Sequence, residues 1–352
     1  MHEVHFFDSK KYDQEYFTQL VGSNFNKYPF KLVFHDFKLN AHTVQAAKGA
    51  KAICAFVNDQ VGKEVIEKLN AEDIHVLALR SAGYNNIDLK AAYNRLHVMR
   101  VPAYSPYSVA EHSLALMLTL NRKTHKAYYR TRENNFSLDG LMGFDLHGKT
   151  VGIVGTGKIG QIAGKILHGF GCRLLAYDPY PQKDFATQYD VNYVDLNTIY
   201  KESDVIALYC PLSSSTYHMI NEEAVSQMKD GVMIINTGRG QLIKTSALIE
   251  GLKAKKIGSA GLDVYEEESQ YFFEDYSQEV LTDDTLARLL SFGNVIVTSH
   301  QAFFTREALS KIAETTLDNL KDYFEGRPLK NEICYHCDKS DHCPKKWGKS
   351  CF

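Results

Sequence analysis

The stretch VGIVGTGKIG, residues 151–160, decides the fold, because it runs a short apolar strand directly into a turn of the form G-x-G-x-x-G. Gly155, Gly157 and Gly160 let the chain turn tightly, let the backbone approach a pyrophosphate and let the next helix pack on the strand. The N-terminus of that helix would face the anion. The stretch predicts a dinucleotide-binding unit that begins in mid-chain, after a separate domain.

Short runs of β-forming residues alternate with helical stretches on both sides of this turn, which predicts parallel sheets. The runs are 3–7, 31–35, 52–57, 75–79 and 97–101 before residue 150, and 151–154, 173–177, 204–209, 232–236, 258–264 and 294–299 after it. We expect the six later runs to form one sheet, with no strand after them. The helical stretch that follows, about 306–325, should return to cover the first domain.

These patterns predict an α/β fold with two doubly wound parallel-sheet domains: a Rossmann dinucleotide-binding domain and a discontinuous, flavodoxin-like domain. The predicted bounds are 1–101 with 300–333 for the discontinuous domain, 102–299 for the dinucleotide-binding domain and 334–352 for a cysteine-rich tail. Ser108 and Glu111 match an S-x-x-E capping box, so a long helix should begin there and cross between the domains.

Composition argues against polyanionic and membrane partners. Lys and Arg together number 40 and Asp and Glu 42, without a dominant basic segment, so we expect no nucleic-acid partner. The N-terminus has no signal-peptide pattern, and the longest apolar helical run, 113–120, is shorter than the roughly 18 residues of a membrane span. We expect a cytoplasmic protein that acts on a small solute and makes no membrane contact.

An acidic residue follows the next predicted strand and bears on the choice of nucleotide. RLLAYD ends in Asp178, within about 20 residues of the glycine turn, where a carboxylate can accept hydrogen bonds from both ribose hydroxyls. The same charge would repel a 2′-phosphate, so NAD is favoured over NADP. The alternative is a structural glycine turn followed by a strand-ending aspartate.

Three polar residues lie just beyond later strands of the same predicted sheet: Arg239, Glu268 and His300. Ligands of open α/β sheets bind outside the carboxyl ends of the strands. Arg239 carries a planar fork that can hold a carboxylate by two parallel hydrogen bonds. Taken singly, Arg239 and Glu268 could each be a solvated charge, and His300 could be a structural histidine. Their shared position beyond strands of one sheet indicates a catalytic site.

Several stretches resemble the D-isomer-specific 2-hydroxyacid dehydrogenases, most closely the NAD-dependent D-lactate dehydrogenases among them. The resemblance spans about residues 1–330 in unbroken order and is carried by SAGYNNIDL, VPAYSPYSVAEH, GKTVGIVGTGKIG, YDPYP, DVIALYCPL, NTGRGQLI, GLDVYEEE and SHQAFFTREAL. It implies the interrupted domain arrangement, with 1–101 and 300–333 as the substrate domain and 102–299 as the NAD-binding domain. It also implies a homodimer associated through the NAD-binding domains. The long helix from Ser108 is a candidate contact element.

The resemblance also implies roles for single residues. Arg239 would bind the substrate carboxylate, His300 would act as acid and base, and Glu268 would orient His300 and favour its protonated form. Substrate-binding residues would be the backbone N–H groups of Gly83 and Tyr84, the side chain of Tyr104, and Phe303 as an apolar wall or a core residue. Cofactor-binding residues would be Gly155, Gly157, Lys158, Ile159, Gly160, Asp178, Cys210, Pro211, Thr237, Gly238 and Asp263.

The expected reaction is reversible hydride transfer between NADH and pyruvate giving D-lactate, a fermentative step that regenerates NAD⁺. One alternative is another D-2-hydroxyacid, such as 2-hydroxyisocaproate or 2-hydroxyglutarate. A different class of alternative is an NAD(H)-sensing binding module of the same fold. Formate oxidation is disfavoured, because Glu268 stands where enzymes of the family that handle formate carry an amide.

The C-terminal stretch CYHCDKSDHCPKKWGKSCF has no counterpart in the family pattern. Its cysteines, Cys334, Cys337, Cys343 and Cys351, read C-x₂-C-x₅-C-x₇-C, enough ligands for a tetrahedral zinc or an iron–sulfur cluster. Redox-sensitive thiols are a second interpretation. A disordered tail or a dimer-contact arm is a third.

Overall fold

The chain forms two compact units, Met1–Ser105 with the chain from Thr305, and Pro106–Phe304. The structure is a computed structural model, and it describes residues 1–335. The predicted domain boundaries, after residues 101 and 299, lie a few residues before the observed ones, which follow Ser105 and Phe304. His300 consequently belongs to the second unit, whereas the predicted boundary places it in the first domain.

The first unit is built on a six-stranded sheet in the order β13-β5-β4-β3-β1-β2. Strands β1 to β5 are parallel, and β13 pairs with β5 antiparallel. The elements are β1 His2–Phe6, α1 Lys11–Ser23, β2 Phe30–Phe34, η1 Val44–Ala47, β3 Ala52–Ala55, α2 Lys63–Ala71, β4 Val76–Leu79, α3 Leu89–Ala92, β5 His97–Met99, α12 Arg306–Phe324 and β13 Glu332–Ile333.

Alternate residues of these strands enter two cores on opposite faces of the sheet. Leu77 and Leu79 pack with α2 on one face, while Val76 and Ala78 pack on the other, against α1 and α12. Helix α12 presents to this core a stripe of side chains of 0–1% exposure, at the i, i+4, i+7 spacing of an amphipathic helix: Ala313, Leu317 and Leu320. The predicted return of this helix to the first domain is what the structure shows.

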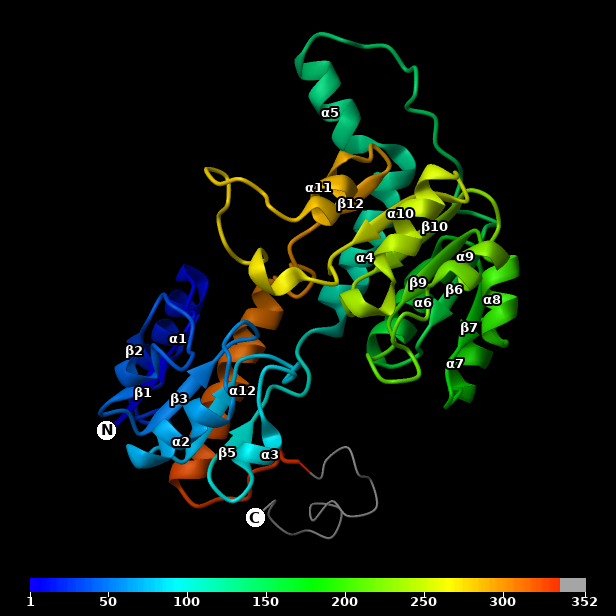
Figure 1. Cartoon of the computed structure of the whole chain (residues 1–352). Coiled ribbons are helices and arrows are strands. Elements are labelled where there is room, and N and C mark those ends of the chain that lie inside the picture. Colours follow the sequence, from blue (N-terminus) through cyan, green and yellow to red (C-terminus); the bar gives the residue numbers. More distant parts are fainter. Residues whose placement is uncertain (336–352) are drawn as a thin grey trace. The chain divides into compact units, whose positions relative to one another are not determined.

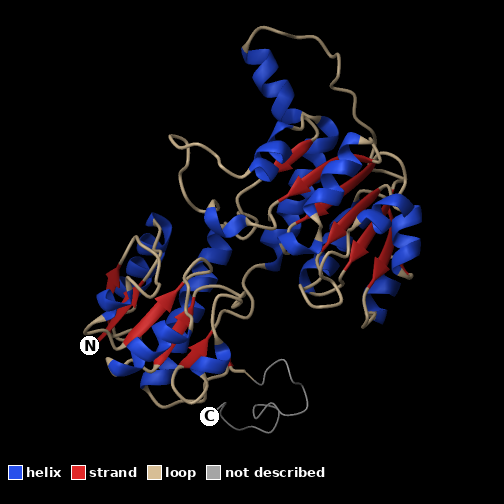
Figure 2. Cartoon of the chain, viewed as in Figure 1, coloured by secondary structure: helices blue, strands red, loops and turns tan. Residues whose placement is uncertain are grey.

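The second unit contains a parallel seven-stranded sheet in the order β12-β11-β10-β9-β6-β7-β8. Its helices flank the strands on both faces, as Figure 2 shows. The elements are α4 Pro106–Arg122, α5 Thr124–Arg132, β6 Thr150–Val154, α6 Lys158–Gly169, β7 Arg173–Tyr177, α7 Lys183–Gln188, β8 Val191–Tyr193, α8 Leu196–Glu202, β9 Val205–Leu208, α9 Glu222–Gln227, β10 Val232–Asn236, η2 Gly240–Leu242, α10 Thr245–Lys253, β11 Ile257–Leu262, η3 Glu268–Gln270, α11 Asp284–Ser291 and β12 Val295–Val297.

Both parallel-sheet units were predicted, and three details of the prediction were wrong. Strand β8 adds a seventh strand to the second sheet, and β13 is a strand after the last predicted one. Helix α4 begins at Pro106 and not at the capping box, so Ser108 is a buried residue inside the first turn. Proline suits the first turn of a helix because its missing N–H would have no helical partner there.

The strand order places β6 between β9 and β7 in the second sheet, where consecutive crossovers turn to opposite sides. From β6 the chain runs to β7 and β8 on one side, and then to β9, β10, β11 and β12 on the other (Figure 1). This reversal is the point at which ligands bind in open α/β sheets. Among the described helices, none is both long and apolar enough to cross a bilayer.

Candidate active site

The glycine turn between β6 and α6 has the geometry that its three glycines predict. Gly155 has a left-handed φ of 95°, and a Cβ there would lie 2.6 Å from the backbone nitrogen of Cys210. A Cβ on Gly160 would lie 2.0 Å from the carbonyl oxygen of Gly155. Gly157, in contrast, has nothing within 4 Å of an added Cβ, so its face of the turn is open to a ligand.

The carboxylate of Asp178 is fixed beside this turn. Its Oδ2 accepts a hydrogen bond from the Thr156 N–H at 2.7 Å, and its Oδ1 accepts one from the Tyr180 N–H at 2.8 Å. Helix α6 begins with Lys158 and Ile159, and its first turn contains no acidic residue to repel an anion. The turn and the carboxylate therefore fit the pyrophosphate and the ribose of a dinucleotide.

The remaining predicted cofactor residues follow β9 and β10. Thr237 is 7% exposed, and its buried Oγ1 has no hydrogen-bond partner among the described residues, which fits a hydroxyl kept for a ligand. Gly238 follows it, and Cys210 and Pro211 follow β9. Burial raises the pKa of the Cys210 thiol to about 11, so this cysteine stays protonated at neutral pH.

Arg239 lies on a turn that two neighbouring residues hold in place. The side chain of Asn236 accepts from the Gly238 N–H at 3.0 Å and donates to the Arg239 carbonyl at 2.9 Å. Gly240 lets the turn pack tightly, because a Cβ there would lie 2.1 Å from the Tyr265 backbone. The Arg239 guanidinium donates to the Gly238 carbonyl at 2.8 Å, and within residues 1–335 it forms no ion pair.

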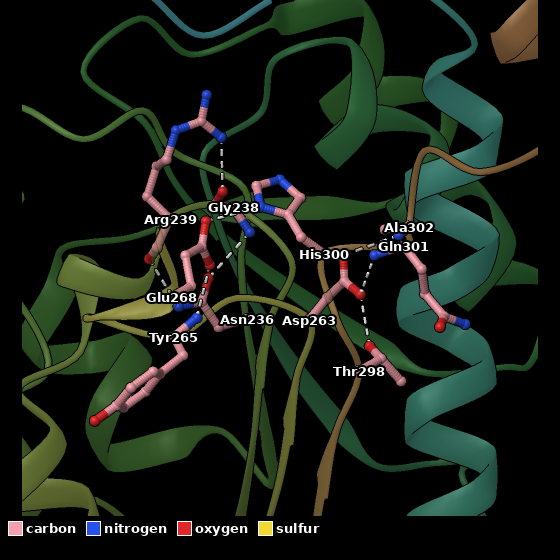
Figure 3. A network of polar contacts seen from close by, with 10 residues as sticks. All are labelled: Asn236, Gly238, Arg239, Asp263, Tyr265, Glu268, Thr298, His300, Gln301 and Ala302. Carbon is pink, nitrogen blue, oxygen red and sulfur yellow. Dashed lines mark hydrogen bonds and ion pairs between the residues drawn. The ribbon is translucent and has the colours of Figure 1, made fainter. Parts of the chain in front are cut away.

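His300 and Glu268 form a hydrogen-bonded pair beyond the ends of β11 and β12. His300 Nδ1 lies 2.8 Å from Glu268 Oε1, and the two side chains are 21% and 24% exposed. The other oxygen of Glu268 accepts from the Tyr265 N–H at 2.9 Å, which fixes the carboxylate. Figure 3 shows the Glu268 carboxylate beside the imidazole, with the Arg239 side chain beyond the strand ends on the same side.

Asp263 fixes the turn that carries His300. Its side chain is fully buried and accepts hydrogen bonds from Thr298 Oγ1 at 2.5 Å and from the Gln301 and Ala302 N–H groups at 2.9 Å each. The N–H of His300 donates to the Asp263 carbonyl at 2.8 Å, and His300 has a left-handed φ of 53°. In this structure the Asp263 carboxylate positions His300, whereas its predicted contact with the cofactor stays a prediction.

Two residues of this region were missed from the sequence. His112 of α4 lies with its Nε2 3.1 Å from Thr298 Oγ1 and 3.4 Å from Asp263 Oδ1, so it extends the buried network behind His300. Phe273 lies with its ring centroid 5.9 Å from that of His300 and 6.5 Å from that of Phe303. The predicted apolar wall at Phe303 therefore continues along Phe273.

The other predicted substrate residues belong to the first unit. Gly83 and Tyr84 lie in the loop that follows β4, and Tyr104 lies between β5 and the end of that unit. All three are half-buried. The structure places Arg239, Glu268, His300 and Phe303 in the second unit and these three residues in the first.

The cysteines of the C-terminal stretch divide between described and undescribed residues. Cys334 directly follows β13 and is 3% exposed. Cys337, Cys343 and Cys351 lie outside the described residues. Within residues 1–335, no group of three or more His, Cys, Asp or Glu side chains could hold a metal ion.

Comparison with known proteins places these features among dehydrogenases. Residues 114–302 match the family model of the D-isomer specific 2-hydroxyacid dehydrogenase NAD binding domain. D-lactate dehydrogenase of Escherichia coli is 51% identical over 328 residues, which cover 93% of this chain and 98% of that protein.

Solved structures agree with this similarity. The apo structure of the Escherichia coli D-lactate dehydrogenase superposes with a TM-score of 0.86 at 49% identity, covering 94% of this chain and 99% of the other. The pyruvate reductase of Chlamydomonas reinhardtii gives 0.88 at 40% identity, covering 94% and 98%.

Proposed function

Because this chain belongs to the D-isomer-specific 2-hydroxyacid dehydrogenase family, we propose that it is an NAD-dependent D-lactate dehydrogenase, which interconverts pyruvate and D-lactate. The observation that carries the proposal is the His300–Glu268 pair, which lies with Arg239 at the carboxyl ends of the strands of the NAD-binding sheet. The names of two similar proteins, a D-lactate dehydrogenase and a pyruvate reductase, support pyruvate as the substrate.

Reduction of pyruvate requires a hydride at the carbonyl carbon and a proton at the carbonyl oxygen. NADH, when bound, supplies the hydride. His300 supplies the proton, because Nδ1 is held by Glu268 and Nε2 is left to face the substrate. The carboxylate of Glu268 orients the imidazole for the transfer. In the reverse direction, the neutral imidazole accepts the proton from the hydroxyl of D-lactate.

Arg239 binds the carboxylate of the keto acid in this proposal. Its turn is held by Asn236 and by close packing against Tyr265, so the Arg239 side chain extends from a backbone that is fixed in position. A planar fork can form two parallel hydrogen bonds to one carboxylate, which positions the carbonyl for reaction as well as binding it. Phe303 and Phe273 would contact the small methyl group of pyruvate.

A panel of keto acids with NADH tests the proposal. The panel contains pyruvate, 2-ketoisocaproate and 2-ketoglutarate, and kcat/KM is measured for each with NADH and with NADPH. We expect the highest value for pyruvate with NADH and a D-configured product. A higher value for 2-ketoisocaproate or 2-ketoglutarate would identify the enzyme as a dehydrogenase of another D-2-hydroxyacid.

An NAD(H)-sensing binding module is the candidate from a different class. It would bind NADH tightly and turn over no member of the panel. The intact pair of His300 and Glu268 favours the enzyme, because a sensor has no need of a hydrogen-bonded acid and base at the strand ends.

We propose that the protein forms a homodimer through the second unit. In Figure 1, α5 projects from this unit and leads into a long loop. Helix α5 has no buried residue, and its region exposes large apolar side chains: Tyr128 at 56%, Tyr129 at 67%, Phe136 at 72%, Leu138 at 81% and Met142 at 86%. Several exposed apolar side chains in one segment of the chain are typical of an interface. Sedimentation of the Tyr129→Glu variant should show a lower mass than that of the wild type.

The C-terminal cysteines keep the three interpretations that their spacing allows: a zinc or iron–sulfur site, redox-sensitive thiols, or a tail or contact arm. The structure suggests where to cut the chain for a test. Removal of residues 336–352 keeps Cys334 and β13, which pairs with β5. Metal content should then fall relative to the full chain if the cysteines bind a metal; equal content near zero rejects that site.

A further inference from the structure

The loop after β4 contains three consecutive peptide groups whose carbonyl oxygens all accept hydrogen bonds. Arg100 Nη1 donates to the Ala82 carbonyl at 2.8 Å, and Ser81 Oγ donates to the Gly83 carbonyl at 2.8 Å. The Tyr84 carbonyl accepts from the Ile87 N–H at 3.1 Å. These hydrogen bonds therefore fix the orientation of the three peptide planes between residues 82 and 85.

Fixing a carbonyl also fixes the N–H of the same peptide group. A trans peptide is planar, so the C=O of one residue and the N–H of the next point in opposite directions. No described residue follows a cis bond. The bond from Arg100 to Ala82 thus directs the Gly83 N–H away from Arg100, and the bond from Ser81 to Gly83 directs the Tyr84 N–H away from Ser81.

The Gly83 N–H has no hydrogen-bond partner within residues 1–335. Gly83 is only half-buried, so a ligand can reach this donor. We propose that Ser81 and Arg100 are positioning residues that aim the Gly83 and Tyr84 N–H groups at the substrate carboxylate. The inference rests on the proposed function and on the family resemblance, which implies that the N–H groups of Gly83 and Tyr84 bind the substrate.

Arg100 is itself held by three backbone contacts. The Val101 N–H donates to the Ser81 carbonyl at 3.0 Å, which ties the end of β5 to the loop. The Arg100 N–H donates to the Asn331 carbonyl at 3.1 Å, and Asn319 of α12 donates to the Arg100 carbonyl at 3.0 Å. The guanidinium lies over the Tyr84 ring, 5.2 Å from its centroid. Both the backbone and the guanidinium of Arg100 are thus held in place.

The hydrogen bonds from Ser81 and from Arg100 differ in strength. A neutral hydroxyl-to-carbonyl bond contributes less than one from a charged donor. A cation on the Ala82 carbonyl also polarises the peptide and strengthens its N–H as a donor. We therefore expect loss of Arg100 to weaken carboxylate binding more than loss of Ser81.

The test separates binding of the keto acid from binding of the cofactor. Steady-state kinetics give KM for pyruvate and for NADH and kcat, and oxamate, an amide analogue that keeps the carboxylate, is titrated into the enzyme–NADH complex. Ser81→Ala should raise KM for pyruvate and Kd for oxamate about threefold to tenfold. Arg100→Met should raise both about tenfold to a hundredfold. KM for NADH should not change, and kcat should fall much less.

Matched controls remove the same kinds of bond elsewhere in the first unit. Ser23→Ala deletes a hydroxyl-to-carbonyl bond to Gln19, and Arg95→Met deletes a guanidinium-to-carbonyl bond to Ala91. Both should leave KM for pyruvate, KM for NADH, kcat and Kd for oxamate at wild-type values. Arg100→Lys keeps a charged donor and should restore part of the affinity that Arg100→Met loses. Thermal unfolding of each variant checks that the fold is intact.

Two outcomes would overturn the positioning role. One is wild-type KM for pyruvate and Kd for oxamate in both Ser81→Ala and Arg100→Met. The other is an equal rise in KM for pyruvate and for NADH, which indicates general damage. A wild-type chain that reduces no keto acid of the panel contradicts the proposed function and this inference with it, whereas an active wild type with unchanged variants contradicts the inference alone.

Discussion

The Nδ1 atom of His300 lies 2.8 Å from Oε1 of Glu268, in a turn where His300 has a φ of 53°. A non-glycine residue is uncommon in this left-handed conformation, and such residues cluster at functional sites. Here the Asp263 backbone and carboxylate hold the turn by three bonds to consecutive N–H groups. The protein thus uses buried hydrogen bonds to keep one imidazole nitrogen engaged and the other available.

Replacing His300 by alanine should lower kcat for pyruvate reduction by about 10² to 10⁴, the usual contribution of a positioned acid or base. The fold should survive, because the side chain is partly exposed and the turn is held through backbone atoms. Rapid kinetics and thermal unfolding measure the two effects. His168→Ala, an exposed histidine of the same unit, is the control. Wild-type kcat in His300→Ala would remove His300 from the mechanism.

Arg239→Lys should raise KM for pyruvate about tenfold or more, because an ammonium cannot reproduce two parallel hydrogen bonds. KM for NADH should change little. Steady-state kinetics with each substrate varied in turn give both constants. The control is Arg288→Lys, an arginine of α11 that lies over the Phe292 ring. An unchanged KM for pyruvate in Arg239→Lys would argue against the carboxylate role.

Asp178→Ser should lower kcat/KM with NADH and weaken the preference for NADH over NADPH. The carboxylate that would accept from the ribose and repel a 2′-phosphate is removed, while a hydroxyl can still accept one backbone hydrogen bond. The ratio of kcat/KM for the two cofactors measures the change. If the ratio stays at the wild-type value, Asp178 does not select the cofactor.

Gly160→Ala and Gly157→Ala form a matched pair within one turn. A methyl group on Gly160 would meet the Gly155 carbonyl at 2.0 Å, so this variant should lose both NADH binding and thermal stability. A methyl group on Gly157 meets nothing within 4 Å, so stability should be retained while NADH binds more weakly. Fluorescence titration and thermal unfolding separate the two. NADH affinity equal to wild type in Gly157→Ala would contradict a close approach of the pyrophosphate there.

Asp59 should make the stability of the first unit depend on pH. Burial raises the pKa of this carboxyl from 3.8 to about 6, against the opposing effects of Arg80 and of the Phe56 and Leu39 N–H groups. A raised pKa means that the folded state binds the proton more tightly, so this contribution to stability is present below about pH 4 and is lost as the pH rises through about 6.

The measurement compares wild type with Asp59→Asn, which does not titrate. The free energy of unfolding of wild type relative to the variant should fall by up to about 3 kcal/mol between about pH 4 and about pH 7. Asp36→Asn, an exposed aspartate of the same unit, serves as the control. A difference that grows with pH would show that the folded protein favours the charged form.

The sequence predicted the elements that are marked by local signals. The glycine turn was visible because Gly155 and Gly160 are required by backbone conformation and close packing, both of which leave a pattern in the chain. Arg239 and His300 stood out because each polar residue ends an apolar run. Their hydrogen-bonding partners were predicted only where the family resemblance supplied them, as for Glu268.

The missed features depend on contacts distant in sequence or on very short elements. Strand β13 has two residues, too few to show an alternating pattern, and β8 is the short segment VNY, which lacks the longer apolar run that marks β12. The contact of His112 with Thr298 joins residues 186 positions apart. The Ser108 capping box was a chance match, since Pro106 already begins the helix. Only the folded chain shows such relationships.

The contribution of α12 to the core of the first unit has a consequence for synthesis on the ribosome. The second unit is continuous from Pro106 to Phe304, so it can fold as soon as it has emerged. Strands β1 to β5 emerge earlier, but the core that they share with α12 lacks Leu317 and Leu320 until these residues have emerged, after the whole of the second unit. The N-terminal part of this protein is therefore made first and completed last.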